Sequence, residues 1–88
     1  SVYAGGTVIP SVSIEPKVIN LGTTGSFDLD VAVVPAGTSV TFTSSDGDVA
    51  TVTSAGKIEA VAAGDCVITA SITVDGVDYT DTVTVIVA

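Results

Sequence analysis

The chain has 88 residues, 47% of them hydrophobic, and ten acidic side chains against two lysines give it a net charge of −8. A chain of this length forms one domain, and its negative charge repels nucleic-acid phosphates and anionic lipid, which excludes nucleic acid as a partner. The apolar runs are too short and interrupted for membrane insertion, and the first ten residues lack the basic start and long apolar stretch of an export signal.

The first eleven residues, SVYAGGTVIPS, precede the strand pattern, so we predict an N-terminal arm or linker at residues 1–11 and a domain at residues 12–88. Gly5 and Gly6 give this arm a hinge. An extended arm can add a strand to the sheet of a partner. The candidate docking residues are the bulky side chains of the arm: Val2, Tyr3, Val8 and Ile9.

The first strand is predicted in two parts, at residues 12–14 and 18–20, because Pro16 cannot donate a hydrogen bond to a sheet ladder. Residues 26–34 alternate apolar and polar side chains with the period of two that a half-exposed strand shows. A turn containing proline and glycine follows, and residues 39–44 resume the alternation.

Short apolar runs at residues 49–52 and 57–61 flank a turn, and longer alternating runs at residues 65–74 and 78–87 flank a turn at residues 75–76. About seven strands with short turns between them predict an all-β sandwich, and no segment shows a helical period. We expect six side chains to meet between the two layers of the sandwich: Phe27, Val40, Phe42, Ile68, Ile72 and Val85.

Residues 41–70, TFTSSDGDVATVTSAGKIEAVAAGDCVITA, combine Ser-Ser, a short turn, Val-Ala-x-Val, Ala-x-Gly and a closing Ile-x-Ala; SIEPKVINLGTTGSFDLDVAVVP precedes them. Together these stretches resemble the bacterial immunoglobulin-like domains of group 2, from about Val12 to Val87. The resemblance implies an immunoglobulin-like sandwich with Greek-key connections. That family usually has tryptophan where Phe42 stands, so it also implies a smaller buried aromatic at the centre of this core.

Acidic residues gather at two turns of the sequence. Asp46 and Asp48 flank Gly47, and Asp75, Asp78 and Asp81 surround Gly76. Calcium requires six to eight oxygen ligands, and neither cluster has the longer acidic spacing and closing glutamate of an EF-hand. We interpret both clusters as structural turns, with calcium binding as the alternative.

The sequence offers little for catalysis. Asp28 and Asp30 are two residues apart on one strand face and are expected to point into solvent, where no cleft separates their pKa values. The chain has no histidine to activate a nucleophile, and a single cysteine, Cys66, can complete neither a zinc site nor an internal disulfide. We predict no enzyme activity and no cofactor, with Cys66 buried.

We expect a structural protein on the exterior of a virion, a phage capsid or tail, which docks on capsid or tail subunits through the arm and one edge of the sandwich. The alternative is an extracellular module of a bacterial adhesin or surface protein that binds protein or cell-surface glycan. Glycan contact has only Tyr3 and Tyr79 as stacking platforms because the chain lacks tryptophan. A homo-oligomer fits either hypothesis. A start at Ser1 suits a complete gene product or an excised domain.

Overall fold

The computed structural model describes residues 9–88, which form nine β-strands and no helix. The strands are β1 (Ser11–Glu15), β2 (Val18–Leu21), β3 (Ser26–Asp28), β4 (Asp30–Val34), β5 (Thr41–Ser44), β6 (Ala50–Val52), β7 (Lys57–Ala60), β8 (Gly64–Val74) and β9 (Val77–Val87). Within this described part of the chain there is no helix of the length and hydropathy that crossing a membrane requires.

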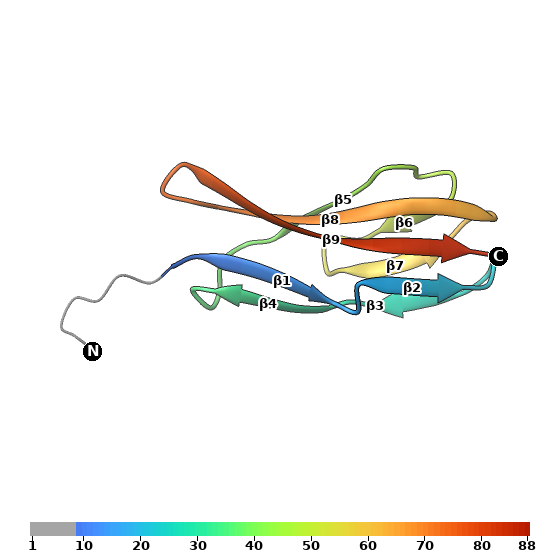
Figure 1. Cartoon of the computed structure of the whole chain (residues 1–88), viewed down its shortest axis with the longest axis horizontal. Coiled ribbons are helices and arrows are strands. Elements are labelled where there is room, and N and C mark those ends of the chain that lie inside the picture. Colours follow the sequence, from blue (N-terminus) through green and yellow to red (C-terminus); the bar gives the residue numbers. More distant parts are fainter. Residues whose placement is uncertain (1–8) are drawn as a thin grey trace.

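The strands form two facing layers (Figure 1). One layer is a four-stranded sheet in the order β2-β9-β8-β5. The other combines the two-stranded sheet β1-β4 with the three-stranded sheet β3-β7-β6, because only Leu29 separates β3 from β4 along the chain. Neighbouring strands are mostly distant in sequence, so the chain crosses repeatedly between the layers, as Greek-key connections require. The predicted fold class, an immunoglobulin-like sandwich, is confirmed.

The first strand changes layers at Pro16. β1 pairs antiparallel with β4, whereas β2 pairs parallel with β9 in the opposite layer. The predicted interruption at the proline is confirmed, although the sequence did not reveal that its two halves enter different sheets. β3 and β4 are likewise two parts of one predicted strand, so counting each interrupted strand once reduces nine strands to seven.

β8 and β9 form the longest hairpin, with Val74 paired to Val77 across a two-residue turn. The turn residues, Asp75 and Gly76, have φ angles of +53° and +78°. A two-residue hairpin whose turn residues both have positive φ is a type I′ turn, for which Asp-Gly is a preferred sequence. The turn chemistry therefore fixes the register of the two longest strands.

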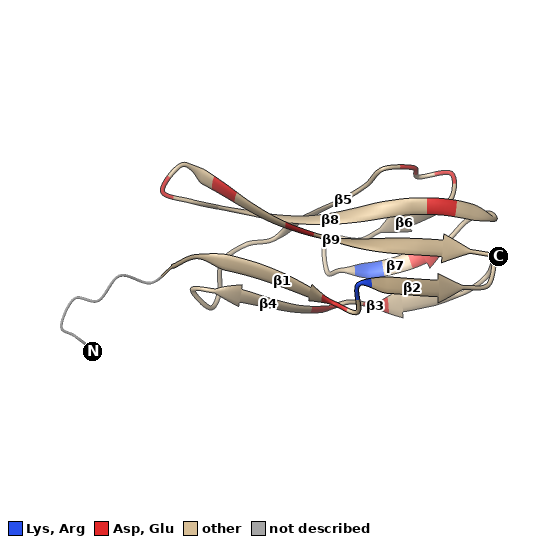
Figure 2. Ribbon diagram, viewed as in Figure 1, with Lys and Arg blue, Asp and Glu red and all other residues tan. Residues whose placement is uncertain are grey.

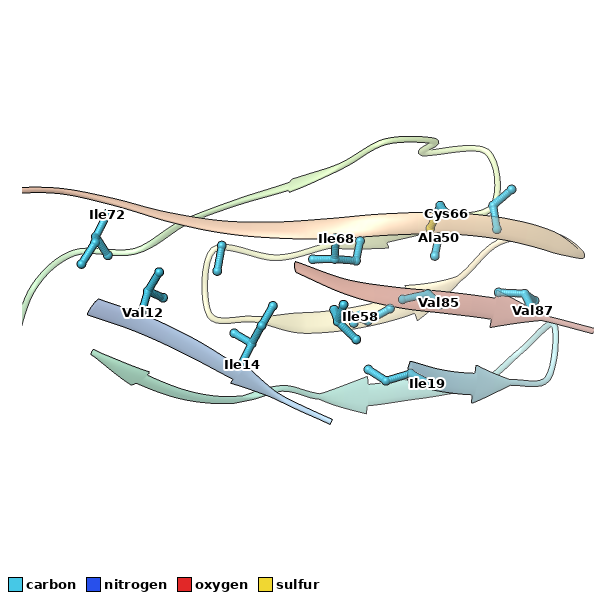
Figure 3. Close-up of a cluster of buried hydrophobic side chains, with 13 residues drawn as sticks. Val12, Ile14, Ile19, Ala50, Ile58, Cys66, Ile68, Ile72, Val85 and Val87 are labelled. Carbon is cyan, nitrogen blue, oxygen red and sulfur yellow. The ribbon is translucent and has the colours of Figure 1, made fainter. Parts of the chain in front are cut away.

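The core lies between the layers and is formed by inward-facing side chains of both (Figure 3). Ile68, Ile72 and Val85 are buried, as predicted. Val40 and Phe42, also predicted for the core, are only half-buried and pack against it. The buried set is otherwise mostly aliphatic, and it includes Val12, Ile14, Ile19, Val49, Ile58, Cys66, Val83 and Val87.

The prediction that Phe27 lies in the core is wrong, because 36% of this residue is exposed. Phe27 is paired with the buried Ile58 across β3 and β7, and directly paired residues point to the same face. The Phe27 side chain therefore lies on the core-facing side of β3, as predicted. β3 is the edge strand of its sheet, so the Phe27 side chain remains open along that edge.

Phe42 packs its ring over Gly56 in the turn between β6 and β7. A Cβ added to Gly56 would lie 3.1 Å from Cζ of Phe42. Gly56 also has a φ of +87°, a conformation that residues with a Cβ rarely adopt. This turn thus requires glycine both for its backbone conformation and for the space that the ring occupies.

Candidate functional site

A groove of about 520 Å³ lies on one side of the sandwich, between the edges of the two layers. β4 contributes Val31 and Val33 to its lining, and the segment leading into and through β5 contributes Val40 and Phe42. Ser54 and Ala55, in the turn between β6 and β7, close one end. The groove is therefore a partly open continuation of the hydrophobic core.

The groove exists because β6 and β7 are too short to cover this side. β7 pairs with β3 and β6, and its neighbouring turn makes a last contact where Leu29 donates its N–H to the carbonyl oxygen of Gly56 at 3.0 Å. Beyond that bond, β4 pairs only with β1 within residues 9–88, and β5 pairs only with β8. The inward-facing side chains of β4 and β5 remain half-buried in consequence.

Most side chains that line the groove are apolar, but polar atoms, including backbone atoms, make up the larger part of its exposed lining. Asp30 and Ser54 are exposed residues of the lining, and Asp28 on β3 is exposed as well. The prediction that Asp28 and Asp30 point outward is confirmed. Figure 2 shows that the acidic residues are spread over turns and strands. The site is suited to an extended ligand that offers apolar side chains to the valines and Phe42 and hydrogen-bonding groups to the polar atoms of the lining.

The first acidic turn is held together by its own aspartates. The N–H of Asp48 donates to Oδ1 of Asp46 at 3.0 Å, and the N–H of Val49 donates to the carbonyl oxygen of Asp46 at 3.1 Å. These bonds close a local turn, which is the structural role predicted for the pair. In the described part of the chain, no three His, Cys, Asp or Glu side chains are grouped so that they could hold a metal ion.

The second acidic cluster is not a cluster in the structure. Asp78 accepts a hydrogen bond from Oγ1 of Thr73 at 2.6 Å, whereas Asp81 accepts one from the N–H of Ile14 at 2.9 Å. Asp78 and Asp81 are an odd number of residues apart on β9, so they point to opposite faces of the sheet. The prediction that Asp81 belongs with the hairpin turn is wrong.

Asp81 connects β9 to the strand that changes layers. Besides the bond from Ile14 on β1, its carboxylate forms a hydrogen-bonded ion pair with Lys17, just after Pro16. The Lys17 bond, followed by the Ile14 N–H, holds the pKa of Asp81 below its ordinary value. No ladder joins β1 to β9 in the described residues, so this carboxylate links them where the sheets do not.

Two further sequence predictions concern single residues. Cys66 is buried, as predicted, with its Sγ 3.9 Å from the Ser44 hydroxyl oxygen. Tyr79 is half-buried and packs against the core, so it does not form an exposed stacking platform. Neither residue adds a reactive or sugar-binding centre to the groove.

The candidate docking residues lie mostly beyond the described part of the chain. Val2, Tyr3 and Val8 fall outside residues 9–88, while Ile9 is 79% exposed and precedes β1. Their role as a docking segment stays a prediction. The groove itself was not predicted, because its formation depends on the lengths of β6 and β7 relative to β4 and β5, which alternation of side chains does not determine.

A two-layer immunoglobulin-like sandwich with an open apolar edge is the class of protein that these observations define. The family model of the bacterial Ig-like domain (group 2) matches residues 8–87, and the chain belongs to that family. No curated protein matches the sequence significantly. Among solved structures, a mutant of intimin from EHEC O157:H7 has a similar fold, with a TM-score of 0.59 and 22% sequence identity. The match covers 91% of this chain and 44% of the intimin chain.

Proposed function

We propose that the chain is a non-enzymatic module of a bacterial surface protein, in which it acts as a spacer and binds a protein partner. The observation that carries this proposal is the position of the chain ends. The described chain begins beside β1 at one end of the long axis and finishes after β9 at the other (Figure 1). A module with this geometry can be joined end to end with others without disturbing its core.

The family and the structural likeness support a surface location. Bacterial Ig-like domains are module types rather than catalytic domains. In the similar intimin structure, the matched region is less than half of the chain, as expected for one module of a longer protein. A protein partner is favoured over a glycan because the groove offers valines and Phe42 instead of a row of hydrogen-bonding side chains. The acidic surface also favours a partner that is neutral or basic.

Decoration of a virion, our first expectation from the sequence, receives no support from the comparisons. They favour the alternative, a surface or adhesin module, because the family is bacterial and the similar solved structure is an intimin. Docking on capsid or tail subunits would require the same exposed edge, so the fold does not distinguish the two locations.

Antibodies against the purified domain would test the location directly. We expect them to label intact cells of the source bacterium, and we expect external protease to remove the label. Labelling confined to lysed cells, or to purified phage particles from the same culture, would contradict the proposal.

A further inference from the structure

The edge of β4 that faces the groove has unpaired backbone groups. Leu29 donates its N–H to Gly56 on the side away from β1. Because backbone groups alternate in direction along a strand, the N–H and C=O groups of Val31 and Val33 point to that same side. Neither residue pairs with another strand there within residues 9–88.

A second contact, made by Ile14, also indicates that the backbone groups of Val31 point toward the groove. Ile14 is opposite Val31 in the β1–β4 pair, yet it donates its N–H to Asp81 and not to β4. Ile14 and Val31 therefore form a non-hydrogen-bonded pair, in which each backbone points away from the other strand. For Val31, that direction is toward the groove.

β5, the strand across the groove from β4, also has an edge that pairs with no other strand in the described residues. Ser45 donates its N–H to the carbonyl oxygen of Val67 on β8, at 2.9 Å. Phe42 is an odd number of residues away, so its backbone groups point away from β8. The groove is thus bordered by two open strand edges and floored by apolar side chains, which is the arrangement that accepts an added β-strand.

We propose that the groove binds residues 1–5 of a second copy of this chain, as an extended strand alongside β4. The charge pattern favours this occupant. The chain has a net charge of −8, but its first ten residues contain no charged side chain. Two copies repel each other over most of their surfaces, whereas the neutral arm approaches an acidic neighbour without that cost.

The position of the arm favours a second copy over the arm's own groove. Ser11 pairs with Val34, so Ile9 leaves the domain past that end of β4. However, β1 lies on one side of β4 and the groove lies on the other. The arm continues from β1, which lies on the side of β4 opposite to the groove of the same chain. The groove of a second copy, placed against this end of the domain, is therefore the better binding site for the arm.

The length and composition of the arm suit this arrangement. Residues 6–10 can span about 16 Å when extended, at about 3.3 Å per residue, which is sufficient to bridge two domains whose ends meet. In the docked strand, Tyr3 faces the groove and Val2 faces away, because side chains alternate. The Tyr3 ring then packs against Phe42, and Ser54 in the lining is a hydrogen-bond partner for its hydroxyl.

The described chain enters β1 opposite the Val34 end of β4, whose other edge borders the groove, so two copies can exchange arms reciprocally. Such an exchange is closed by a twofold axis and produces a dimer instead of a filament. The association does not depend on the proposed surface location, and it can be tested on the purified chain whether or not that location is correct.

Residue-resolved hydrogen exchange by NMR on the full chain tests the proposal. We expect the amides of Val31 and Val33 to exchange about tenfold or more slowly at high than at low protein concentration, as strand pairing protects them. The amide of Ala32 points to β1 and is the internal control, since it should be protected equally at both concentrations. Sedimentation of the same samples should show a monomer that converts to a dimer.

Two variants separate the arm from general charge effects. Tyr3→Asp should abolish both the dimer and the added protection, whereas Thr23→Asp, with the same charge change in the exposed turn after β2, should preserve both. Protection of Val31 and Val33 that is independent of concentration would overturn the proposal, since it indicates an arm bound to its own domain. Unprotected amides at every concentration, or a dimer that survives Tyr3→Asp, would also overturn it.

Discussion

Replacement of Asp81 tests how the two layers are connected. Asp81 on β9 accepts the N–H of Ile14 at 2.9 Å and forms an ion pair with Lys17. Ile14 is fully buried, and its backbone has no other partner on that side among the described residues. Asp81→Ala removes both interactions and leaves a part-buried donor unpaired, whereas Asp81→Asn retains an acceptor and removes only the charge.

The contacts of Asp81 determine how much free energy of unfolding each substitution should remove. A hydrogen bond to a charged acceptor contributes about 1.5 to 3 kcal/mol, and an exposed ion pair adds no more than about 1 kcal/mol. Half of the Lys17 side chain is exposed (50%), so the ion pair contributes the smaller part. We expect Asp81→Ala to lower the free energy of unfolding by about 2 to 3 kcal/mol and Asp81→Asn by about 1 kcal/mol. For a domain of this size, the larger loss lowers Tm by about 10 to 20 °C.

The effect should depend on pH with a defined sign. The pKa of Asp81 is lowered in the folded protein, chiefly by the Lys17 hydrogen bond. A carboxyl whose pKa is lowered on folding stabilises the protein above its unfolded-state pKa, about 3.9, and loses that contribution as the pH falls through the folded-state pKa. Glu15 also lies 3.8 Å from Lys17, so it is the other carboxylate that contacts this lysine.

Thermal unfolding followed by circular dichroism, at pH 7 and through acid pH, measures these effects. The stability difference between wild type and Asp81→Asn should be largest near neutral pH and should disappear below the folded-state pKa of Asp81. Asp78→Asn is the matched control, because Asp78 is exposed and its carboxylate accepts a side-chain hydrogen bond from Thr73 alone among residues 9–88. If Asp81→Ala were no less stable than Asp78→Asn, the proposed link between β1 and β9 would be refuted.

Three further predictions concern the core and the turns. Gly56→Ala should lower the free energy of unfolding, measured with denaturant, by about 2 kcal/mol or more, because Gly56 has a positive φ and contacts Phe42. Gly37→Ala is the control and should lower it by about 1 kcal/mol, because Gly37 also has a positive φ (+84°) but no atom lies near its added Cβ. Ile68→Ala should cost about 2 to 5 kcal/mol, and Val67→Ala, on the exposed face of the same strand, should cost under about 1 kcal/mol; equal losses would contradict the assigned faces. Calcium at millimolar concentration should leave Tm unchanged, since the turn at Asp46 is closed by its own hydrogen bonds and Asp78 and Asp81 point to opposite faces of β9; a rise in Tm would reveal a site.

The alternation of side chains was sufficient to predict most of the sandwich. Cys66, Ile68 and Ile72 on β8, with Val83 and Val85 on β9, are buried as the period of two requires. These strands are long and each has a polar face rich in threonine, so only one orientation buries the apolar side. The interruption at Pro16 was also predictable, because proline cannot donate to a ladder.

The features that depend on tertiary pairing were not predictable. The exposure of Phe27 follows from the edge position of β3, and the link from Asp81 to Ile14 joins residues that are 67 positions apart. The groove arises because β7 begins at Lys57, opposite Asp28, so no residue of β7 pairs with β4. Strand order and strand length decide all three, and neither is encoded in the local pattern of apolar residues.

The most direct test of the account is an NMR experiment on a mixture of isotope-labelled and unlabelled chains, in which only contacts between different molecules are observed. We predict intermolecular contacts from the ring of Tyr3 to Val33 and Phe42, the residues that line the groove beside the open edge of β4. If Tyr3 showed contacts only within its own chain, or none to these residues in a sample that sediments as a dimer, the groove would not be the docking site.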